Sequence, residues 1–304
     1  MGRLLLVHAH PDDEALATGV VIADALHRGH DVDLITATLG DEGEIIPPEL
    51  AHLVAARDDT LWAHRRSELS RAMLALAAAA RDGAVLRHTV LGDGAWSMPG
   101  KPATRAPARW RDSGMAGTPS AEHPRAWVRA DLDEAADAMA AVIADAQPDV
   151  VVSYDPGGGY GHPDHIRTRE VLLAALRRLP EGNRPRRRFD IVTPVTWADE
   201  DRAWLAGHVP AEAGLHIPSR TDPYAVSVVP DAAVSHVVRA PALVEFQAAA
   251  LQGHATQVTV GDGYFALSNN IAARLSGREG FAARGVIDDE LIVVETPWQT
   301  SLFD

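Results

Sequence analysis

The chain has 304 residues, of which 46% are hydrophobic, and 28 Lys and Arg stand against 42 Asp and Glu, a formal net charge of -14. A chain of this length and apolar content can bury a sizeable core, which argues against disorder. The negative charge would repel nucleic acid and anionic lipid, so we expect neither as a partner. The sequence contains no cysteine, so disulfides and thiolate ligands are excluded and any metal ion must be bound by histidines and carboxylates.

Strands and helices are predicted to alternate along the first 180 residues. Residues 4–7 form a continuous apolar run, which is typical of a strand buried on both faces of a parallel sheet. Helical spacing of apolar residues over 14–27, followed by Gly29, predicts a helix, and a strand at 32–37 completes a β-α-β unit. The alternation continues with helices at 61–80, 132–146 and 163–179 and strands at 85–91 and 150–154. This order predicts a Rossmann-like three-layer α/β fold with a mostly parallel sheet.

Two irregular segments interrupt the alternation. Residues 92–124 are rich in Gly, Pro, Ala, Ser and Arg, and a loop of this length is usually functional, so we expect it beside the site. Residues 180–188 are the best candidate boundary between a catalytic domain, 1–182, and a smaller C-terminal α/β part, 183–304, which completes the site. We interpret the basic cluster at 184–188 as a solvated linker. In the C-terminal part we predict strands at 191–197, 233–238 and 291–295 and a helix at 241–252.

No segment of the sequence has the features of a targeting or membrane-spanning element. The apolar run at 4–7 is too short for the hydrophobic region of a signal peptide. Nowhere do about 18 apolar residues follow one another, as a membrane span would require. We therefore expect a cytoplasmic protein without a membrane partner, whose oligomeric state the sequence leaves unknown.

The densest polar cluster, His8-Ala9-His10-Pro11-Asp12-Asp13-Glu14, follows the first predicted strand. In an open parallel sheet the ligand crevice lies beyond the carboxyl ends of the strands, so these side chains are positioned for a metal ion or a reacting group. Acidic residues at the start of a helix are also common caps, because the helix dipole favours anions there. This motif alone therefore leaves both interpretations open.

A second cluster follows the strand predicted at 150–154 and ends in His162-Pro163-Asp164-His165. Two strands that each deliver a His-Pro-Asp element to one sheet edge are what a metal site assembled from separate strand ends requires. A hydrolytic zinc ion takes three His or carboxylate ligands and keeps a position open for water, and two His and one Asp meet that need. A carboxylate beside the metal can accept a proton from the water, and a nearby His can stabilise the product of attack. Asp12 and His162 are the candidates.

The glycine run at 157–159 precedes Tyr160. Its spacing is not that of a phosphate-binding loop, which disfavours nucleotide binding. The glycines let the chain pass close to a substrate and bring Tyr160 into the site, where its phenol could donate to an oxyanion. The alternative is a tyrosine that only packs.

The paired motifs at 10–14 and 162–165 resemble the zinc-dependent amino-sugar deacetylases of the LmbE-like, or PIG-L, superfamily. The segments 109–117, 158–165, 254–258 and 267–270 look like the mycothiol-pathway branch of that superfamily. The resemblance runs from residue 4 to about 270, so it bears on both the fold and the chemistry.

The resemblance implies a metal centre and a general base. His10, Asp13 and His165 would bind one Zn2+ per subunit, although His and carboxylate sites also accept Fe2+ or other divalent metals. Asp12 would be the general base, and His162 would serve as an acid or as an electrostatic stabiliser.

Four further residues acquire roles from the same resemblance. Asp164 would orient His162, and Tyr160 would help to bind the tetrahedral intermediate. Arg65 and Asp112 would hold the hydroxyls of the sugar and the inositol of a small-molecule amino-sugar substrate. A lone arginine on a helix such as 61–80 is, however, often part of a solvated face.

The superfamily leaves three functional hypotheses. The first is removal of acetyl from an N-acetylglucosaminyl-inositol in mycothiol biosynthesis, and the second is cleavage of mycothiol S-conjugates by an amidase. The amidases carry a Lys shortly after the first motif, whereas 14–19 holds no basic residue, which favours the deacetylase. A non-catalytic sugar-binding module is the third, and it is disfavoured because every candidate catalytic residue is in place. Residues 94–108 depart from the family pattern and look like an insertion at the pocket rim, of undetermined role.

Overall fold

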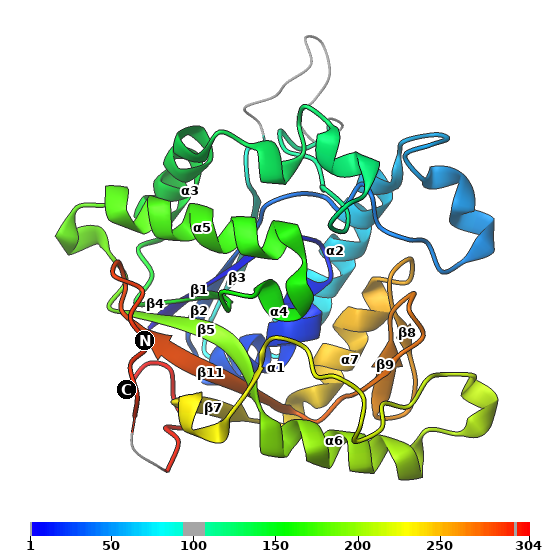
Figure 1. The fold of residues 1–304 in the computed structure, drawn as a ribbon. Coiled ribbons are helices and arrows are strands. Elements are labelled where there is room, and N and C mark those ends of the chain that lie inside the picture. The colour runs from blue at the N-terminus through cyan, green and yellow to red at the C-terminus, as the bar shows by residue number, and fades with distance from the viewer. Residues whose placement is uncertain (1, 94–106, 295–296) are drawn as a thin grey trace.

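The computed structural model describes residues 2–93, 107–294 and 297–304 (Figure 1). Its centre is one large sheet whose strands are β1 (Arg3–His8), β2 (Asp31–Thr36), β3 (Leu86–Val90), β4 (Val150–Tyr154), β5 (Arg187–Pro194), β6 (Val228–Val229), β7 (His236–Arg239) and β11 (Arg278–Arg284). The strand order is β3-β2-β1-β4-β5-β11-β7, and β6 pairs with β5. The pairs from β3 to β5 are parallel, whereas β11 runs antiparallel to both β5 and β7.

Helices cover both faces of this sheet (Figure 1). One face packs against α1 (Asp13–His27), α2 (Leu61–Ala77) and α7 (Val244–Gly253), and the other against α3 (Leu132–Ala146) and α5 (Pro163–Arg178). The short α4 (Gly158–Gly161) follows β4, and α6 (Val195–His208) follows β5. A second, antiparallel sheet consists of β8 (Thr259–Val260), β9 (Tyr264–Ala266) and β10 (Ala272–Arg274).

Strand β1 explains why the apolar run near the N-terminus is continuous. Leu4 and Leu6 belong to the core beneath α1 and α2, whereas Leu5 and Val7 belong to the core beneath α3 and α5. Successive side chains of a strand point to opposite faces, so a strand covered on both sides needs apolar residues at every position. The predicted α/β fold with a mostly parallel sheet is confirmed.

The predictions for the C-terminal part were partly wrong. The strand predicted at 191–197 ends at Pro194, and Val195 begins helix α6 instead. Of the strand predicted at 291–295, the described residues form only an isolated bridge between Arg284 and Leu291, and Ile292 and Val293 are exposed. Strand β11, which the prediction missed, contains Arg, Glu and Gly and shows no apolar run.

The interpretation of 184–188 as a solvated linker was also wrong for its last residue. The side chain of Arg188 is fully buried and its Nη1 lies 3.1 Å from Oδ1 of Asp190. Residues 187 and 188 begin β5, which pairs with β4, so the chain after residue 183 extends the same sheet. Most of the predicted insertion at 94–108 lies outside the described residues, and no helix among those described is long and apolar enough to cross a membrane.

Candidate metal centre and active site

The two His-Pro-Asp motifs meet because β1 and β4 are neighbouring parallel strands. Asp13 lies between the two histidines that the sequence suggests as its partners. Its Oδ2 is 3.5 Å from Nδ1 of His10, and its Oδ1 is 3.4 Å from Nε2 of His165. All three side chains are buried. The structure thus brings the three predicted metal ligands together at the carboxyl edge of the sheet.

Two overlapping groups of side chains in the described part of the chain have ligand atoms close enough to hold a metal ion. Within each group the ligand atoms lie no more than 4.8 Å apart. One consists of His10, His162 and His165, and the other of His10, Asp112 and Asp164. His10 belongs to both, and Asp13 contacts two members of the first. The centre therefore offers a metal ion more donors than the three predicted ones.

Tyr154, at the last position of β4, holds Asp13 in place, a role that the sequence reasoning missed. Its hydroxyl donates to Oδ2 of Asp13 at 2.7 Å and accepts from the amide of Ala9 at the same distance. Its ring stacks on His165 with 4.0 Å between ring centroids. The position of this tyrosine, at the end of a buried strand and just before an active-site loop, was the feature of the sequence that could have indicated its role.

Asp12 has an unusual backbone conformation, and its side chain pairs with an arginine. Its φ is 116°, a region that non-glycine residues rarely adopt. Its Oδ2 lies 3.1 Å from Nη2 of Arg65. Burial raises the pKa of the Asp12 carboxyl to about 7, although Arg65 acts in the opposite direction. A strained residue with a perturbed carboxyl at the end of a strand is typical of a functional site.

Glu14 and His254 form a buried pair behind Asp12, and the sequence reasoning assigned a role to neither. Nε2 of His254 lies 2.7 Å from Oε1 of Glu14, and both side chains are fully buried. The other oxygen of Glu14 accepts the amide of Asp12 at 2.9 Å. The pair therefore fixes the strained segment from its far side. Residues 254–258 carried part of the family resemblance, and this was the feature of the sequence that could have pointed to His254.

The loop predicted to lie beside the site contributes Asp112 and Ser113. Oδ1 of Asp112 lies 3.5 Å from Nε2 of His10, and the same nitrogen contacts Oδ2 of Asp164 at 3.1 Å. Asp164 also accepts the amide of Ser113 at 2.9 Å. The carboxylate of Asp164 thus contacts His10, while its backbone amide donates to Nδ1 of His162 at 3.1 Å. His162 is oriented by the backbone of Asp164 in this arrangement.

Arg65 and Tyr160 differ in their exposure. Arg65 is only 3% exposed, so it is not part of a solvated helix face. Besides Asp12, its guanidinium donates to the carbonyl oxygens of Gly40 and Pro11. Tyr160 is 54% exposed, and its ring centroid lies 5.8 Å from that of His162. Arg65 therefore contacts the motif itself, whereas Tyr160 stands at the opening.

The charges of the centre suit a bound cation. Four buried carboxylates, those of Asp12, Asp13, Asp112 and Asp164, gather around three histidines and the guanidinium of Arg65. Burial lowers the pKa of His162 to about 3 and that of His165 to about 4, so both rings are neutral near pH 7, as metal ligands must be. Nε2 of His165 is buried with no hydrogen-bond partner among the described residues. Burial of unbalanced carboxylates is costly, and a divalent cation would offset it.

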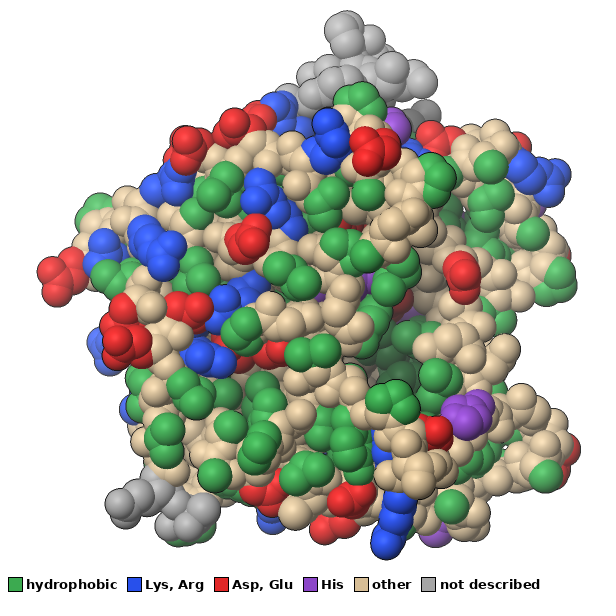
Figure 2. Space-filling view, viewed as in Figure 1, with side chains coloured by type: hydrophobic (Ala, Val, Ile, Leu, Met, Phe, Trp, Pro, Cys, Tyr) green, Lys and Arg blue, Asp and Glu red, His purple; other side chains and the backbone are tan. Residues whose placement is uncertain are grey.

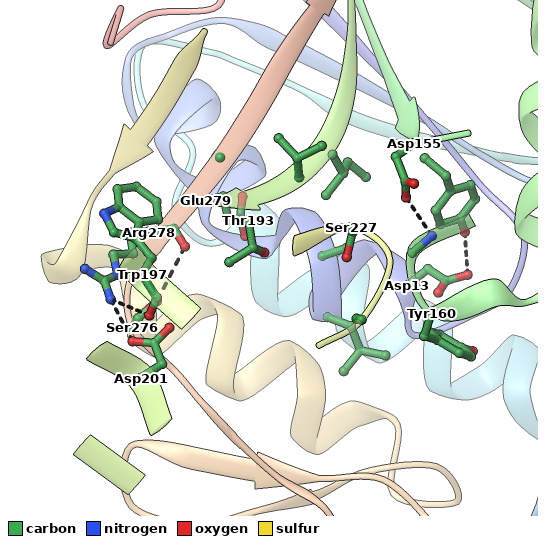
Figure 3. A pocket seen from close by; sticks show the side chains of 18 of the residues that line it. Asp13, Asp155, Tyr160, Thr193, Trp197, Asp201, Ser227, Ser276, Arg278 and Glu279 are labelled. Carbon is green, nitrogen blue, oxygen red and sulfur yellow. Dashed lines mark hydrogen bonds and ion pairs between the residues drawn. The ribbon is translucent and has the colours of Figure 1, made fainter. Parts of the chain in front are cut away.

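A cavity of about 350 Å3 extends from this centre toward the C-terminal part of the chain (Figure 3). Asp13, Tyr160 and His165 line one end, and residues of α6, β10 and β11 line the other. Figure 2, viewed from the same side as Figure 1, shows a hollow in the surface with hydrophobic side chains around it. Residues from both predicted parts of the chain therefore form one pocket.

The fold and the site define a Rossmann-like α/β protein with a buried His and carboxylate centre beside a pocket. The family model described as PIG-L, GlcNAc-PI de-N-acetylase, matches residues 5–176. The chain belongs to this family, as its two motifs predicted.

Curated relatives match over almost the whole chain. The 1D-myo-inositol 2-acetamido-2-deoxy-alpha-D-glucopyranoside deacetylase of Nocardiopsis dassonvillei is 40% identical over 98% of this chain and 99% of its own length. The protein of the same name from Rhodococcus opacus is 42% identical, over 94% of this chain and 93% of its own. The solved structure of GalB, the 4-carboxy-2-hydroxymuconate hydratase of Pseudomonas putida KT2440, covers 84% of this chain and 80% of its own with a TM-score of 0.50 and 17% identity. This last likeness concerns the fold alone.

Proposed function

We propose that the chain is a metal-dependent amide hydrolase that removes acetyl from N-acetylglucosaminyl-inositol, giving glucosaminyl-inositol and acetate in mycothiol biosynthesis. The names of relatives about 40% identical over nearly the full chain support the substrate and the reaction. The observation that carries the proposal is the group of buried carboxylates around three histidines, of which His162 and His165 have lowered pKa values, at one end of the pocket. Such a centre suits metal-assisted hydrolysis.

The metal is proposed to be Zn2+, held by His10, Asp13 and His165. Two His and one carboxylate are a ligand set found in catalytic zinc sites, and the absence of cysteine leaves no thiolate alternative. Bound there, the ion would supply a Lewis acid for the acetamide carbonyl and would lower the pKa of water. Tyr154 holds Asp13, and the backbone amide of His10 donates to the same carboxylate at 2.9 Å.

Asp12 is proposed as the general base. Its carboxylate accepts the proton of the attacking water as the new carbon–oxygen bond forms, and it returns that proton to the amine nitrogen as the carbon–nitrogen bond breaks. A base with a pKa near the working pH is well suited to this transfer, and burial shifts the pKa of Asp12 in that direction, to about 7. Arg65, at 3.1 Å, orients this carboxylate. We therefore propose that Arg65 serves chiefly to position Asp12, in place of contacting a hydroxyl of the sugar.

His162 is proposed to stabilise the charge that develops on the substrate. Nδ1 of His162 accepts the amide of Asp164, so the proton of the neutral ring resides on Nε2. That nitrogen can donate a hydrogen bond to the developing oxyanion, and Tyr160 can donate a second one from the opening. The lowered pKa of His162 favours this electrostatic role over that of a proton donor. Asp112 is proposed to bind a substrate hydroxyl.

A paired assay tests the proposed function. The purified protein is incubated with N-acetylglucosaminyl-inositol and, separately, with a bimane conjugate of mycothiol, before and after removal of metal by a chelator. We expect metal-dependent release of acetate from the first compound and much slower cleavage of the second. Preferred cleavage of the conjugate would identify an amidase, and cleavage of neither would refute the hydrolase proposal.

A further inference from the structure

The pocket beside the metal centre is longer than the reaction requires. Asp13 and Tyr160 stand at one end, whereas Trp197, Asp201 and Arg278 stand at the other (Figure 3). Acetyl removal takes place at the first end, so the remainder of the pocket is available for the part of the substrate that does not react. This role for the remainder of the pocket rests on the proposed function.

Two hydroxyl side chains line the middle of the pocket, next to the loop that carries Tyr160. The amide of Ser227 donates to the carbonyl of Gly159 at 2.9 Å, and the amide of Thr193 donates to the carbonyl of Ser227 at 2.9 Å. These backbone hydrogen bonds fix both residues beside the loop that carries Tyr160. In the described part of the chain, neither hydroxyl has a hydrogen-bond partner. Both hydroxyls are therefore available to a ligand in the pocket.

The charged groups at the far end balance one another. Oδ1 of Asp201 lies 3.0 Å from Nη1 of Arg274 and 2.8 Å from Nη2 of Arg278. Arg278 also pairs with Glu200 at 2.5 Å, and its guanidinium lies 4.6 Å from the centre of the Trp197 ring. Two guanidinium groups thus meet two carboxylates. The two guanidinium groups that line this end can offer hydrogen bonds to a ligand, but their charges are already paired with carboxylates.

Another carboxyl group in the pocket, that of Glu279, adds little charge near neutral pH. Its oxygens accept the amides of Val20 and Val21 at 2.8 Å each, and burial raises its pKa to about 8. The walls between the two ends include the apolar side chains of Phe265 and Leu267. The pocket therefore combines apolar walls, available hydroxyls and a polar end whose lining guanidinium groups are paired with carboxylates.

We propose that this part of the pocket binds the polyol ring linked to the acetamido sugar, with Thr193 and Ser227 as specificity-determining residues. A polyol ring is uncharged, presents hydroxyls around its edge and has C–H groups on its faces. The hydroxyls in the middle of the pocket and the polar groups near Asp201 can form hydrogen bonds with the hydroxyls of the ring. The apolar walls can pack against its C–H faces, and the paired charges suit an uncharged ligand. An anionic ligand would find the guanidinium groups already paired, and a purely apolar ligand would leave the hydroxyls without partners.

The test compares two substrates that differ only in this ring. The values of kcat/KM for acetate release are measured with N-acetylglucosaminyl-inositol and with N-acetylglucosamine, which lacks the polyol. For Thr193→Val and for Ser227→Ala, the ratio of the first value to the second should fall about tenfold, because each variant loses a hydrogen bond to the polyol only. Thr259→Val makes the same change at an exposed position of β8 that does not line the pocket, and it should leave the ratio as it is in the parent.

Three outcomes separate the interpretations. Equal losses of kcat/KM for both substrates would leave the ratio unchanged and would show that the hydroxyls act on the sugar or on the fold. Unchanged kcat/KM values for both substrates would show that the hydroxyls do not contact the polyol. Either outcome would overturn the proposed polyol site while leaving the proposed deacetylase function in place. Failure of the parent protein to release acetate from either compound would instead refute the proposed function and, with it, this inference.

Discussion

Two buried clusters of charged side chains lie on the described part of the sheet, and they differ in their ratio of arginines to carboxylates. Toward the amino end of β5, Arg169, Arg188 and Arg284 surround Asp190, with Asp289 close by. Nη1 of Arg188 lies 3.1 Å and Nε of Arg284 2.8 Å from oxygens of Asp190. At the carboxyl edge, in contrast, four buried carboxylates lie together, and among the described residues Asp12 is the one of them that pairs with an arginine, Arg65.

This difference separates a structural cluster from a functional one. In the first cluster each carboxylate has more than one guanidinium partner, so the charges satisfy one another and lock β5, α5 and β11 together. In the second, carboxylates remain in excess and two histidines are neutral, so the cluster can accept a cation. We therefore expect substitutions in the first cluster to change stability and substitutions in the second to change the chemistry.

The largest effect is expected from Asp13→Ala. This variant removes the carboxylate that contacts both His10 and His165. Bound metal should be lost, and turnover should fall by more than about 10^3-fold. Metal analysis and acetate release measure the two effects. Asp24→Ala, farther along α1, is the control and should retain both, and full activity in Asp13→Ala would contradict the proposed ligand set.

A large effect on stability alone is expected from Arg188→Leu. It leaves the buried Asp190 with fewer guanidinium partners, which should lower the free energy of unfolding by about 3 kcal/mol. The neighbouring Arg186, whose side chain is 85% exposed, provides a matched control. Arg186→Leu should change the free energy of unfolding by less than about 0.5 kcal/mol. Similar values for the two variants in urea unfolding would contradict the structural role of the cluster.

A smaller effect, on turnover, is expected from Glu14→Gln. It weakens the contact with His254 and the support of the strained Asp12 backbone. The value of kcat should fall about 10- to 100-fold while KM and metal content stay close to those of the parent. Glu68→Gln disturbs a comparable buried contact, that of Glu68 with Thr256, and should lower stability without this loss of kcat. Equal kcat values in both variants would refute the positioning role of Glu14.

The smallest effect concerns the pH dependence of stability. Burial raises the pKa of Glu279 to about 8 from its ordinary value of 4.5. Between these values the folded chain keeps a proton that the unfolded chain releases, so this group's contribution to stability is lost as the pH rises. Relative to the parent, Glu279→Gln should gain at least about 1 kcal/mol in unfolding free energy between about pH 5 and pH 8. A constant difference over this range would contradict the raised pKa.

The sequence was most informative where one strong physical constraint acts. Burial on both faces imposes the apolar run of β1, and neighbouring parallel strands bring His10 and His165 to one edge. Contacts between single residues that lie far apart in the sequence, outside any motif, could not be predicted. His254 reaches Glu14 only through the packing of α7 on α1, and Arg188 differs from the exposed Arg186 only by its place in β5.

The end of β5 shows the limit of local patterns. The apolar residues of 191–197 predicted a continuous strand, but Pro194 ends β5 and the chain turns into α6. The resulting position of Trp197 and Asp201 in the pocket depends on this turn. The metal-centre end of the pocket was thus foreseeable from motifs, whereas its far end required the three-dimensional arrangement.

Asp12→Asn is the most direct test of the central claim, that a metal centre and a separate carboxylate base act together. Asparagine keeps the size of the side chain and tolerates positive φ, but it cannot accept a proton as a carboxylate does. Metal content and acetate release from N-acetylglucosaminyl-inositol are measured on the same preparation. We predict the metal content of the parent with turnover reduced by about 10^3-fold. Turnover equal to that of the parent would contradict the claim.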